Sequence, residues 1–491
     1  MRNALGFGLL FLVACSSVVV TPETTSSSSS SGSGGAAGGM AVSSSSSSAS
    51  STGGPDEPKG VCSAAPSAGN TPYAAAWAKG MANLSTDLVA PAADGGVLLG
   101  GWHTGPVDFG AGLSLPDGAG RFLLQYGPAG EPLSLDTLPD DIAQVIAGPE
   151  GSLWTTAPAD VGSKVVISKR TPHGVPLWGV PVPVPEVRIA AGADGGLIVA
   201  GRFSGQLVYG GVSLSTKNPS DSDLFVLALD AVGSLRWIAR AGAALPPPPS
   251  DGYLLLHALD VAAAPDGGAV VAAATTLGAK DAPEKHGLLV LRLDGNGKVA
   301  WTNADPLVDH APDTTVTVDA SGRVFLVGAT GPGAEVHLGG CTFHGGGIVV
   351  SAFEADGKPR WGTIFHGDLG VTHPLLDPAG NLVLTGEVMG DIDFGGGVLH
   401  GPPNQFRIML ARLSPDGAHL ASQSFGGGPL MDAGLPLQES RTEAAALDAN
   451  GQLMMTGYYT GGLDFGTGAL PFVPVMEGPY VTDAWVVKLG P

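Results

Sequence analysis

Residues 313–367 read DTTVTVDASGRVFLVGATGPGAEVHLGGCTFHGGGIVVSAFEADGKPRWGTIFHG. Asp, Ser and Gly, which favour tight turns, separate the apolar runs of this unit. Short apolar runs bounded by turn residues are typical of antiparallel strands. The unit therefore predicts four strands of about five to eight residues each. The four runs begin near Thr315, Val324, Val349 and Arg360.

The same pattern recurs along the chain, with a period of about 60 residues. Aligning the third strand of each copy through the glycine of the following turn gives seven equivalent positions: Phe122, Val166, Phe225, Leu289, Val349, Met409 and Trp485. Repeats of a linear solenoid are usually shorter than this. We therefore predict an all-β fold, a seven-bladed β-propeller of four-stranded antiparallel blades.

The copies also share a tryptophan near the start of the fourth strand. It is present as Trp178, Trp237, Trp301 and Trp361, and copies one and six lack it. Recurrence once per blade favours an inter-blade core role, while a stacking platform for sugars or a quinone is the alternative. Copy two is short and lacks the glycine-rich arm found in other copies.

The two ends of the repeat region complement each other. The last copy stops after its third strand, at Lys488–Pro491, and an unassigned strand at Tyr73–Lys79 carries Trp77 at the position of the recurring tryptophan. We predict that this N-terminal strand pairs with residues 483–489 and completes blade seven. Such closure removes an exposed sheet edge.

These repeats resemble the bacterial seven-bladed β-propeller repeat family of secreted and surface proteins. The resemblance covers residues 71–491 and is based on Asp-x-x-Gly turns, Gly-x-x-Asp-Phe-Gly arms and a strand that ends near tryptophan. A weaker resemblance, at Leu293–Trp301, is to quinoprotein-type propellers, which include outer-membrane assembly scaffolds. The resemblance implies a fold and an exported location, and no particular activity.

The N-terminus predicts export and lipid anchoring. Residues 1–14 form a cationic and then apolar signal peptide, too short to span a bilayer. Leu12-Val13-Ala14-Cys15 resembles the bacterial lipobox, which implies cleavage before Cys15 and its acylation, with palmitate among the chains. An ordinary signal peptide with a chance cysteine is the alternative. Ser16, by resemblance to Gram-negative lipoproteins, favours the outer membrane.

Residues 15–70 are expected to be a lipid-anchored, disordered tether, because a stretch dominated by Ser and Gly buries too little apolar surface to fold. The propeller domain then covers residues 71–491. The formal net charge of −21 argues against nucleic-acid binding, since phosphates would be repelled.

The arm between the second and third strands carries a bulky residue followed by glycine. We interpret this residue as a packing device in the five arms, namely Phe109, Tyr209, Leu338, Phe394 and Phe465. As b–c loops, the arms are expected to cluster on one face of the ring. The tether is expected to join the propeller at residue 72, on the opposite face, which carries the short turns. The arm face would then lie away from the membrane.

Histidines gather in the arms and d–a loops of blades five and six. Together with two aspartates they are candidate ligands for Zn²⁺ or Cu²⁺, although no tight metal-binding spacing is present. The candidate set is His337, His344, His366, His373, His400, Asp391 and Asp393. Scattered surface histidines are the alternative, and no other cofactor is predicted.

Cys62 and Cys341 remain after lipidation. An exported location permits a disulfide. However, Cys62 is expected near the short-turn face and Cys341 on the arm face, which argues against pairing. Prolines 246–249 predict a stiff spur between blades three and four.

No nucleophile elbow, phosphate-binding loop or dinucleotide fingerprint is present. We therefore expect an anchored, non-catalytic binding or scaffold module that contacts a protein or glycan through the b–c loop face. The alternatives are an exported enzyme, such as a polysaccharide hydrolase or lyase, and a metal-binding sensor. The enzyme alternative requires converging acidic or histidine side chains with perturbed pKa values near the ring axis.

Overall fold

The computed structural model of the protein describes residues 62–160, 164–216, 221–241, 252–279, 282–304, 313–402, 405–426, 440–471 and 483–491. The predictions for the signal peptide, Cys15, most of the tether and prolines 246–249 lie outside the described residues. In the described part, no helix is long and apolar enough to cross a bilayer.

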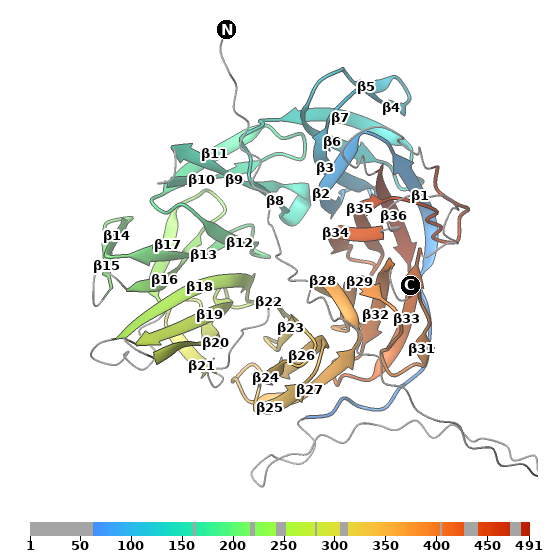
Figure 1. Ribbon diagram of the computed structural model, residues 1–491. Helices are drawn as coiled ribbons and strands as arrows, with labels where there is room; N and C mark the ends of the chain where they lie inside the picture. Colours follow the sequence, from blue (N-terminus) through green and yellow to red (C-terminus); the bar gives the residue numbers. More distant parts are fainter. Residues whose placement is uncertain are drawn as a thin grey trace, which may run out of the picture. The chain divides into compact units, whose positions relative to one another are not determined.

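The described residues form seven antiparallel four-stranded sheets in a closed ring, which confirms the predicted propeller (Figure 1). Within each blade, strands a to d run from the ring axis outward. The first three blades are β2 (Leu84–Pro91), β3 (Val97–His103), β6 (Gly120–Tyr126) and β7 (Pro132–Leu138); β8 (Gln144–Ala147), β9 (Leu153–Asp160), β10 (Lys164–Arg170) and β11 (Pro176–Val182); and β12 (Val187–Ala191), β13 (Leu197–Ser204), β16 (Ser222–Leu229) and β17 (Leu235–Arg240). A short 3-10 helix, η1 (Pro149–Gly151), forms the a–b turn of blade two.

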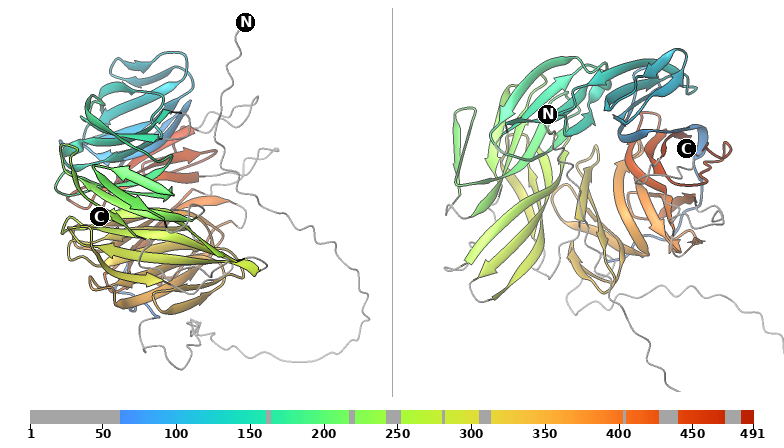
Figure 2. Two further views of the ribbon diagram at one scale, coloured as in Figure 1. Left: turned by 90° about the vertical axis from the view of Figure 1, so that its left-hand side faces the viewer. Right: turned by 45° about the horizontal axis from the view of Figure 1, so that its top comes forward.

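The remaining blades continue around the ring, which Figure 2 shows from two further directions. All seven positions aligned from the sequence lie on c strands. Blades four to seven are β18 (Gly252–Ala263), β19 (Ala269–Ala279), β20 (Ala282–Leu293) and β21 (Val299–Ala304); β22 (Asp313–Val318), β23 (Val324–Thr330), β26 (Gly347–Phe353) and β27 (Pro359–His366); β28 (Asp368–Leu376), β29 (Leu382–Met389), β32 (Phe406–Leu413) and β33 (His419–Phe425); and β34 (Ser440–Leu447), β35 (Leu453–Tyr459), β36 (Asp483–Gly490) and β1 (Ala74–Met81).

The N-terminal strand closes the ring as predicted. β1 pairs antiparallel with β36, with Ala74 opposite Gly490 and Met81 opposite Ala484. Trp77 lies opposite Lys488 on this ladder. Blade seven is therefore built from both ends of the propeller region, which confirms that the ring is closed rather than an open stack.

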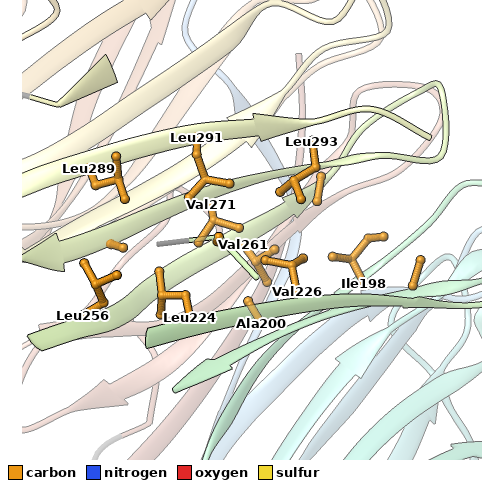
Figure 3. Packing of buried hydrophobic residues seen from close by; sticks show 14 of the residues in the cluster. Ile198, Ala200, Leu224, Val226, Leu256, Val261, Val271, Leu289, Leu291 and Leu293 are labelled. Carbon is orange, nitrogen blue, oxygen red and sulfur yellow. The ribbon is translucent and has the colours of Figure 1, made fainter. Parts of the chain in front are cut away.

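Apolar packing holds each blade to the next. Alternate side chains of a strand project to opposite sheet faces, so each blade buries one face against each neighbour. Seven separate core clusters result, one for each junction, including the junction between blades seven and one. Figure 3 shows the cluster between blades three and four, where Leu224 and Val226 face Leu289 and Leu291.

The arms do not form the ring face that the sequence suggested. Four of them are two-stranded hairpins at the outer rim (Figure 1): β4 (Val107–Gly110) with β5 (Leu113–Leu115), β14 (Gln206–Tyr209) with β15 (Val212–Ser215), β24 (Glu335–Leu338) with β25 (Cys341–His344), and β30 (Ile392–Asp393) with β31 (Val398–Leu399). In blade seven, the arm contains one bridge, between Asp464 and Ala469.

The glycines at two arm tips lie close to other strands of their own blades. A Cβ on Gly339 would lie 3.0 Å from Phe353, at the end of the c strand of blade five. A Cβ on Gly395 would lie 3.5 Å from His419, the first residue of the d strand of blade six. The arms thus fold back along their own blades, and their tips approach the short-turn end.

The same folding back corrects the expected placement of Cys62 and Cys341 at opposite faces, which argued against a disulfide but left their pairing open. The two residues form a disulfide with a Cα–Cα distance of 5.4 Å. Cys341 begins β25 at the tip of the blade-five arm, so it lies near the short-turn end with Cys62. Residue 72 is therefore not the point at which the N-terminal segment first joins the ring, since the ring is already contacted at Cys62.

Candidate functional site

The candidate metal ligands of blade five lie on its outer arm. His337 Nε2 is 3.1 Å from Glu335 Oε1, and its Nδ1 is 3.0 Å from Thr342 Oγ1. His344 Nδ1 is 3.6 Å from Glu335 Oε2. These two histidines therefore share one carboxylate, which the sequence reading had not included.

The blade-six candidates have separate partners. His400 Nδ1 is 3.0 Å from Asp391 Oδ2, while Asp391 Oδ1 accepts the backbone N–H of Gly401. That N–H and His400 lower the pKa of Asp391. Asp393 accepts backbone N–H groups within its own arm, from Gly395 and Gly397.

The last two candidates, His366 and His373, lie at the outer and inner strands of their blades. His366 ends β27, and His373 is on β28, the innermost strand of blade six. Burial lowers the pKa of His373. The structure does not bring the seven candidates together, and among the described residues no three His, Cys, Asp or Glu side chains are grouped as metal ligands.

The bulky arm residues pack toward the preceding blade. Phe394 lies 5.0 Å from Phe365 of blade five, and Phe465 lies 4.9 Å from Phe425 of blade six, both between ring centroids. Leu338 is buried among residues of blades four and five, while Phe109 and Tyr209 are half-buried. These side chains are thus placed in junctions between blades.

The recurring tryptophans occupy equivalent positions on the outermost strands of blades two, three, four, five and seven. Each packs against a positive-φ glycine in the c–d turn of the next blade. For Trp178, Trp301 and Trp361, the indole N–H also donates to a carbonyl of that turn, at 3.2, 3.0 and 2.9 Å. The five pairs are Trp77 with Gly130, Trp178 with Gly233, Trp237 with Gly297, Trp301 with Gly357, and Trp361 with Gly417.

Two carboxylate residues whose charges influence one another, Asp87 and Glu443, lie on the innermost strands of blades one and seven. The ladder between β2 and β3 shifts at Asp87, and the ladder between β34 and β35 shifts in the same way at Glu443. Each shift is a β-bulge, which leaves one residue unpaired and changes the direction of its side chain. Matching bulges on adjacent blades thus leave two carboxylate residues, Asp87 and Glu443, outside the ladders of the innermost strands.

Glycine opposite each bulge makes the geometry possible. A Cβ on Gly101 of β3 would lie 2.0 Å from the carbonyl oxygen of Ser85. A Cβ on Gly457 of β35 would lie 1.9 Å from the carbonyl oxygen of Arg441. These strand glycines are the sequence signal for the two bulges, because a strand glycine often marks a bulge or a close backbone approach.

Arg121 holds Asp87 in place. Its Nη2 lies 2.6 Å from Asp87 Oδ2 and its Nη1 lies 3.4 Å from Oδ1. The arginine side chain is 4% exposed and that of Asp87 is 41% exposed. The guanidinium also lies 4.9 Å from the ring centroid of Trp102, so two contacts position it. Because Arg121 is the second residue of β6, this pair lies toward the b–c end of the ring.

Arg441 supplies a second cation beside Glu443. Its guanidinium lies 4.5 Å from the ring centroid of Phe406. Burial raises the pKa of Glu443, Arg441 lowers it and Asp87 raises it further. We call Asp87, Arg121, Arg441 and Glu443 the axial cluster; it contains two carboxylates in different surroundings, each near a guanidinium.

Polar contacts between blades support the axial cluster. Thr456 Oγ1 of blade seven donates to Thr86 Oγ1 of blade one over 2.8 Å. Glu387 Oε1 of blade six accepts the backbone N–H of Thr442 over 2.7 Å. The residues adjacent to Asp87 and Glu443 are therefore bonded to neighbouring blades, which limits movement of the two bulges.

Two cavities lie away from the axial cluster, between the short turns of neighbouring blades. One, of about 250 Å³, lies between blades three and four and is lined by Asp194, Arg236 and Asp266. The other, of about 290 Å³, lies between blades four and five and is lined by Asp266, Arg292 and Asp294. Asp194 and Asp266 already pair with Arg236 and Arg292, at 2.7 Å each, so these cations are engaged within the protein.

No protein-family model and no curated protein matches the chain. Solved structures that match include a hydrazine synthase of Kuenenia stuttgartiensis, with a TM-score of 0.39 and 13% identity over 65% of this chain and 76% of that one. A polysaccharide lyase matches with a TM-score of 0.39 and 11% identity, over 82% of this chain and 89% of that one. A Bacteroides caccae protein of unknown function matches with a TM-score of 0.31 and 11% identity, over 62% of this chain and 82% of that one. At these identities the likeness concerns the fold alone.

Proposed function

We propose that the protein is an exported lipoprotein, anchored through acylated Cys15 in the outer membrane or at the surface of a Gram-negative cell. Its propeller is a non-catalytic binding or scaffold module for a protein or glycan. The lipobox-like Leu12–Cys15 and the Ser/Gly-rich residues 21–55 support the anchor and the tether. Incorporation of labelled palmitate, and its loss in Cys15→Ser, tests the anchor; acylation that persists in the variant contradicts it.

The axial cluster carries the proposal of binding. Its carboxylates belong to the residues of the two paired bulges, and the pair of Asp87 and Arg121 lies toward the b–c end of the ring. Carboxylates accept hydrogen bonds from hydroxyl groups and amides, and Asp87, which is 41% exposed, remains open to a ligand while the buried Arg121 holds it in place. Such a set suits a polar ligand, a glycan or an extended peptide, at this end of the ring.

Binding is tested with the non-acylated chain from Ser16 onward on arrays of bacterial polysaccharides and in pull-downs from envelope fractions. We expect Asp87→Asn combined with Glu443→Gln to weaken binding at least about tenfold, the equivalent of 1.4 kcal/mol. The matched control removes the exposed pair Asp356 and Lys358 at the short-turn end. Equal loss in both variants, or no loss in the first, would count against the axial cluster.

One observation favours the enzyme alternative. Glu443 has a raised pKa, whereas neighbouring Asp87 is paired with Arg121. Carboxylates in contrasting surroundings can divide the acid and base roles in sugar chemistry. Release of reducing ends would indicate a hydrolase, and unsaturated products would indicate a lyase. Turnover that disappears in Glu443→Gln while binding remains would replace the non-catalytic proposal.

A further inference from the structure

Residues 62–73 run along the outer edge of blade six before the closing strand begins. The backbone N–H groups of Ala65, Ala68 and Thr71 donate to the carbonyl oxygens of Asp416, His419 and Leu420, over 3.2, 2.9 and 3.0 Å. The order of partners shows that the segment runs in the same direction as β33.

Side chains add to this edge contact. Ser422 donates its backbone N–H to Asn70 Oδ1 over 3.2 Å, and Gln423 Nε2 donates to the carbonyl of Tyr73 over 3.1 Å. The ring of Tyr73 is buried in the core between blades six and seven. The segment thus covers an edge strand that would otherwise be free to pair with another chain.

The far end of the segment is bonded covalently to a different blade. Cys62 forms its disulfide with Cys341, which is 1% exposed at the arm tip of blade five. A partner 279 positions away in the sequence is therefore joined directly to the start of the described chain. Between this bond and the first residue of β1 there are only the residues that lie along blade six.

The closing strand is the element that this arrangement protects. β1 is the outermost strand of blade seven and is paired with one neighbour, β36. A pull on its N-terminal end would separate this ladder one residue pair at a time. Apart from the buried ring of Tyr73, the contacts of residues 64–73 are hydrogen bonds with a net value of about 1 kcal/mol each, and they would yield first.

We propose that residues 62–73 and the Cys62–Cys341 bond form a clasp that diverts tension arriving from the N-terminal side into blade five, away from the closing strand β1. The inference rests on the proposed function only in that the anchored tether supplies the tension. With the disulfide intact, tension passes from Cys62 through the two sulfur atoms to Cys341. Residues 63–81 lie outside that path.

Reduction opens the clasp. A dithiol donates two electrons and two protons, the S–S bond breaks, each cysteine gains a thiol, and the reductant becomes a cyclic disulfide. Tension then follows the backbone from residue 62 through the blade-six edge to β1. The ring seam becomes the first element to separate.

Single-molecule pulling tests the clasp directly. One handle is attached at the N-terminus of the chain from Ser16 onward, and the other at position 232, which is 72% exposed in the c–d turn of blade three. In the presence of dithiothreitol, we expect a first, low-force event that releases residues 62–81. These 20 residues correspond to roughly 70 Å of extended chain at about 3.5 Å per residue.

In the oxidised protein this event should be absent, and Cys62→Ser with Cys341→Ser should behave as the reduced protein does. Ala68→Pro with the disulfide intact is the matched control, because it removes one edge hydrogen bond but leaves the covalent path. The event should remain absent in that variant. An identical first event in oxidised and reduced protein would overturn the proposal, whatever the outcome for acylation or ligand binding, because the instrument itself supplies the tension.

Discussion

The indole N–H of Trp77 donates a hydrogen bond to the carbonyl oxygen of Pro128 across 3.0 Å. The ring of Trp77 also packs on Gly130, in the c–d turn of blade one. Trp361 of blade five makes the same two contacts with Pro415 and Gly417 of blade six. The closing strand β1 is therefore joined to blade one by the same joint that connects consecutive blades elsewhere.

Replacement of Trp77 should weaken the ring at its seam. Trp77→Ala removes a buried aromatic ring, a change that costs about 3–5 kcal/mol in the free energy of unfolding. Trp361→Ala is the matched variant at an internal joint. Denaturant unfolding should report losses of similar size, whereas hydrogen exchange at β36 should accelerate only in Trp77→Ala. Faster exchange at β36 in both variants would contradict a local role at the seam.

Replacement of Gly130, the turn glycine that packs against Trp77, should also destabilise the protein. Gly130 has a φ of 84°, and a Cβ there would lie 2.8 Å from Cδ2 of Trp77. Gly110 has the same φ of 84° but nothing within 4 Å of its Cβ position. Gly110→Ala should lower the free energy of unfolding by about 1 kcal/mol through backbone strain alone. Gly130→Ala should lower it by clearly more, because the new Cβ would also collide with Trp77. Equal melting temperatures for the two variants would show that the contact with Trp77 contributes nothing.

The comparison of Trp77 with Cys62 shows where sequence reasoning succeeds. Trp77 was identifiable because the same residue type recurs at the same place in four other copies, so its partner strand followed from the repeat. Cys62 has no counterpart in any copy. Its pairing with Cys341 depends on the arm folding back along blade five, where Gly339 lies close to Phe353, and no periodicity reveals this approach.

The axial cluster was missed for a related reason. Asp87 and Glu443 lie on inner strands whose alternation would place them on a blade face. A one-residue bulge changes their direction, and the only sequence signal is a glycine on the next strand, at Gly101 and Gly457. The histidines drew attention because they are close together in the sequence, but antiparallel arms and inner strands separate them in space.

Loss of the Asp87 carboxylate should lower the free energy of unfolding more than loss of its partner Arg121. Asp87→Asn leaves a buried guanidinium without its counter-ion, and we expect about 1–3 kcal/mol of destabilisation. Arg121→Met leaves Asp87 partly solvated, so its cost should be smaller. Urea unfolding of both single variants and the double variant gives the coupling energy. An additive double variant would mean that the ion pair contributes no stability.

Asp260 should make stability fall as pH rises. It lies on the innermost strand of blade four, where Oδ1 accepts the N–H of Val261 over 2.8 Å and Oδ2 accepts the N–H of Val316 of blade five over 2.9 Å. Burial raises its pKa from 3.8 to about 6, although both N–H groups and Arg188 act in the opposite direction. The carboxyl therefore titrates near pH 6 in the folded protein and near pH 3.8 in the unfolded chain.

The sign of the effect follows from proton counting. Between the two pKa values the folded state holds the proton more tightly than the unfolded chain, so stability decreases with rising pH across this window. A shift from 3.8 to about 6 corresponds to about 3 kcal/mol. Asp260→Asn cannot ionise and should lack this component. Burial lowers the pKa of His373 and so acts in the opposite direction, which makes the difference between wild type and variant the informative quantity. Urea unfolding of both proteins at intervals from pH 4 to pH 7 measures it, and parallel stability curves would contradict a buried, titrating Asp260 at the junction of blades four and five.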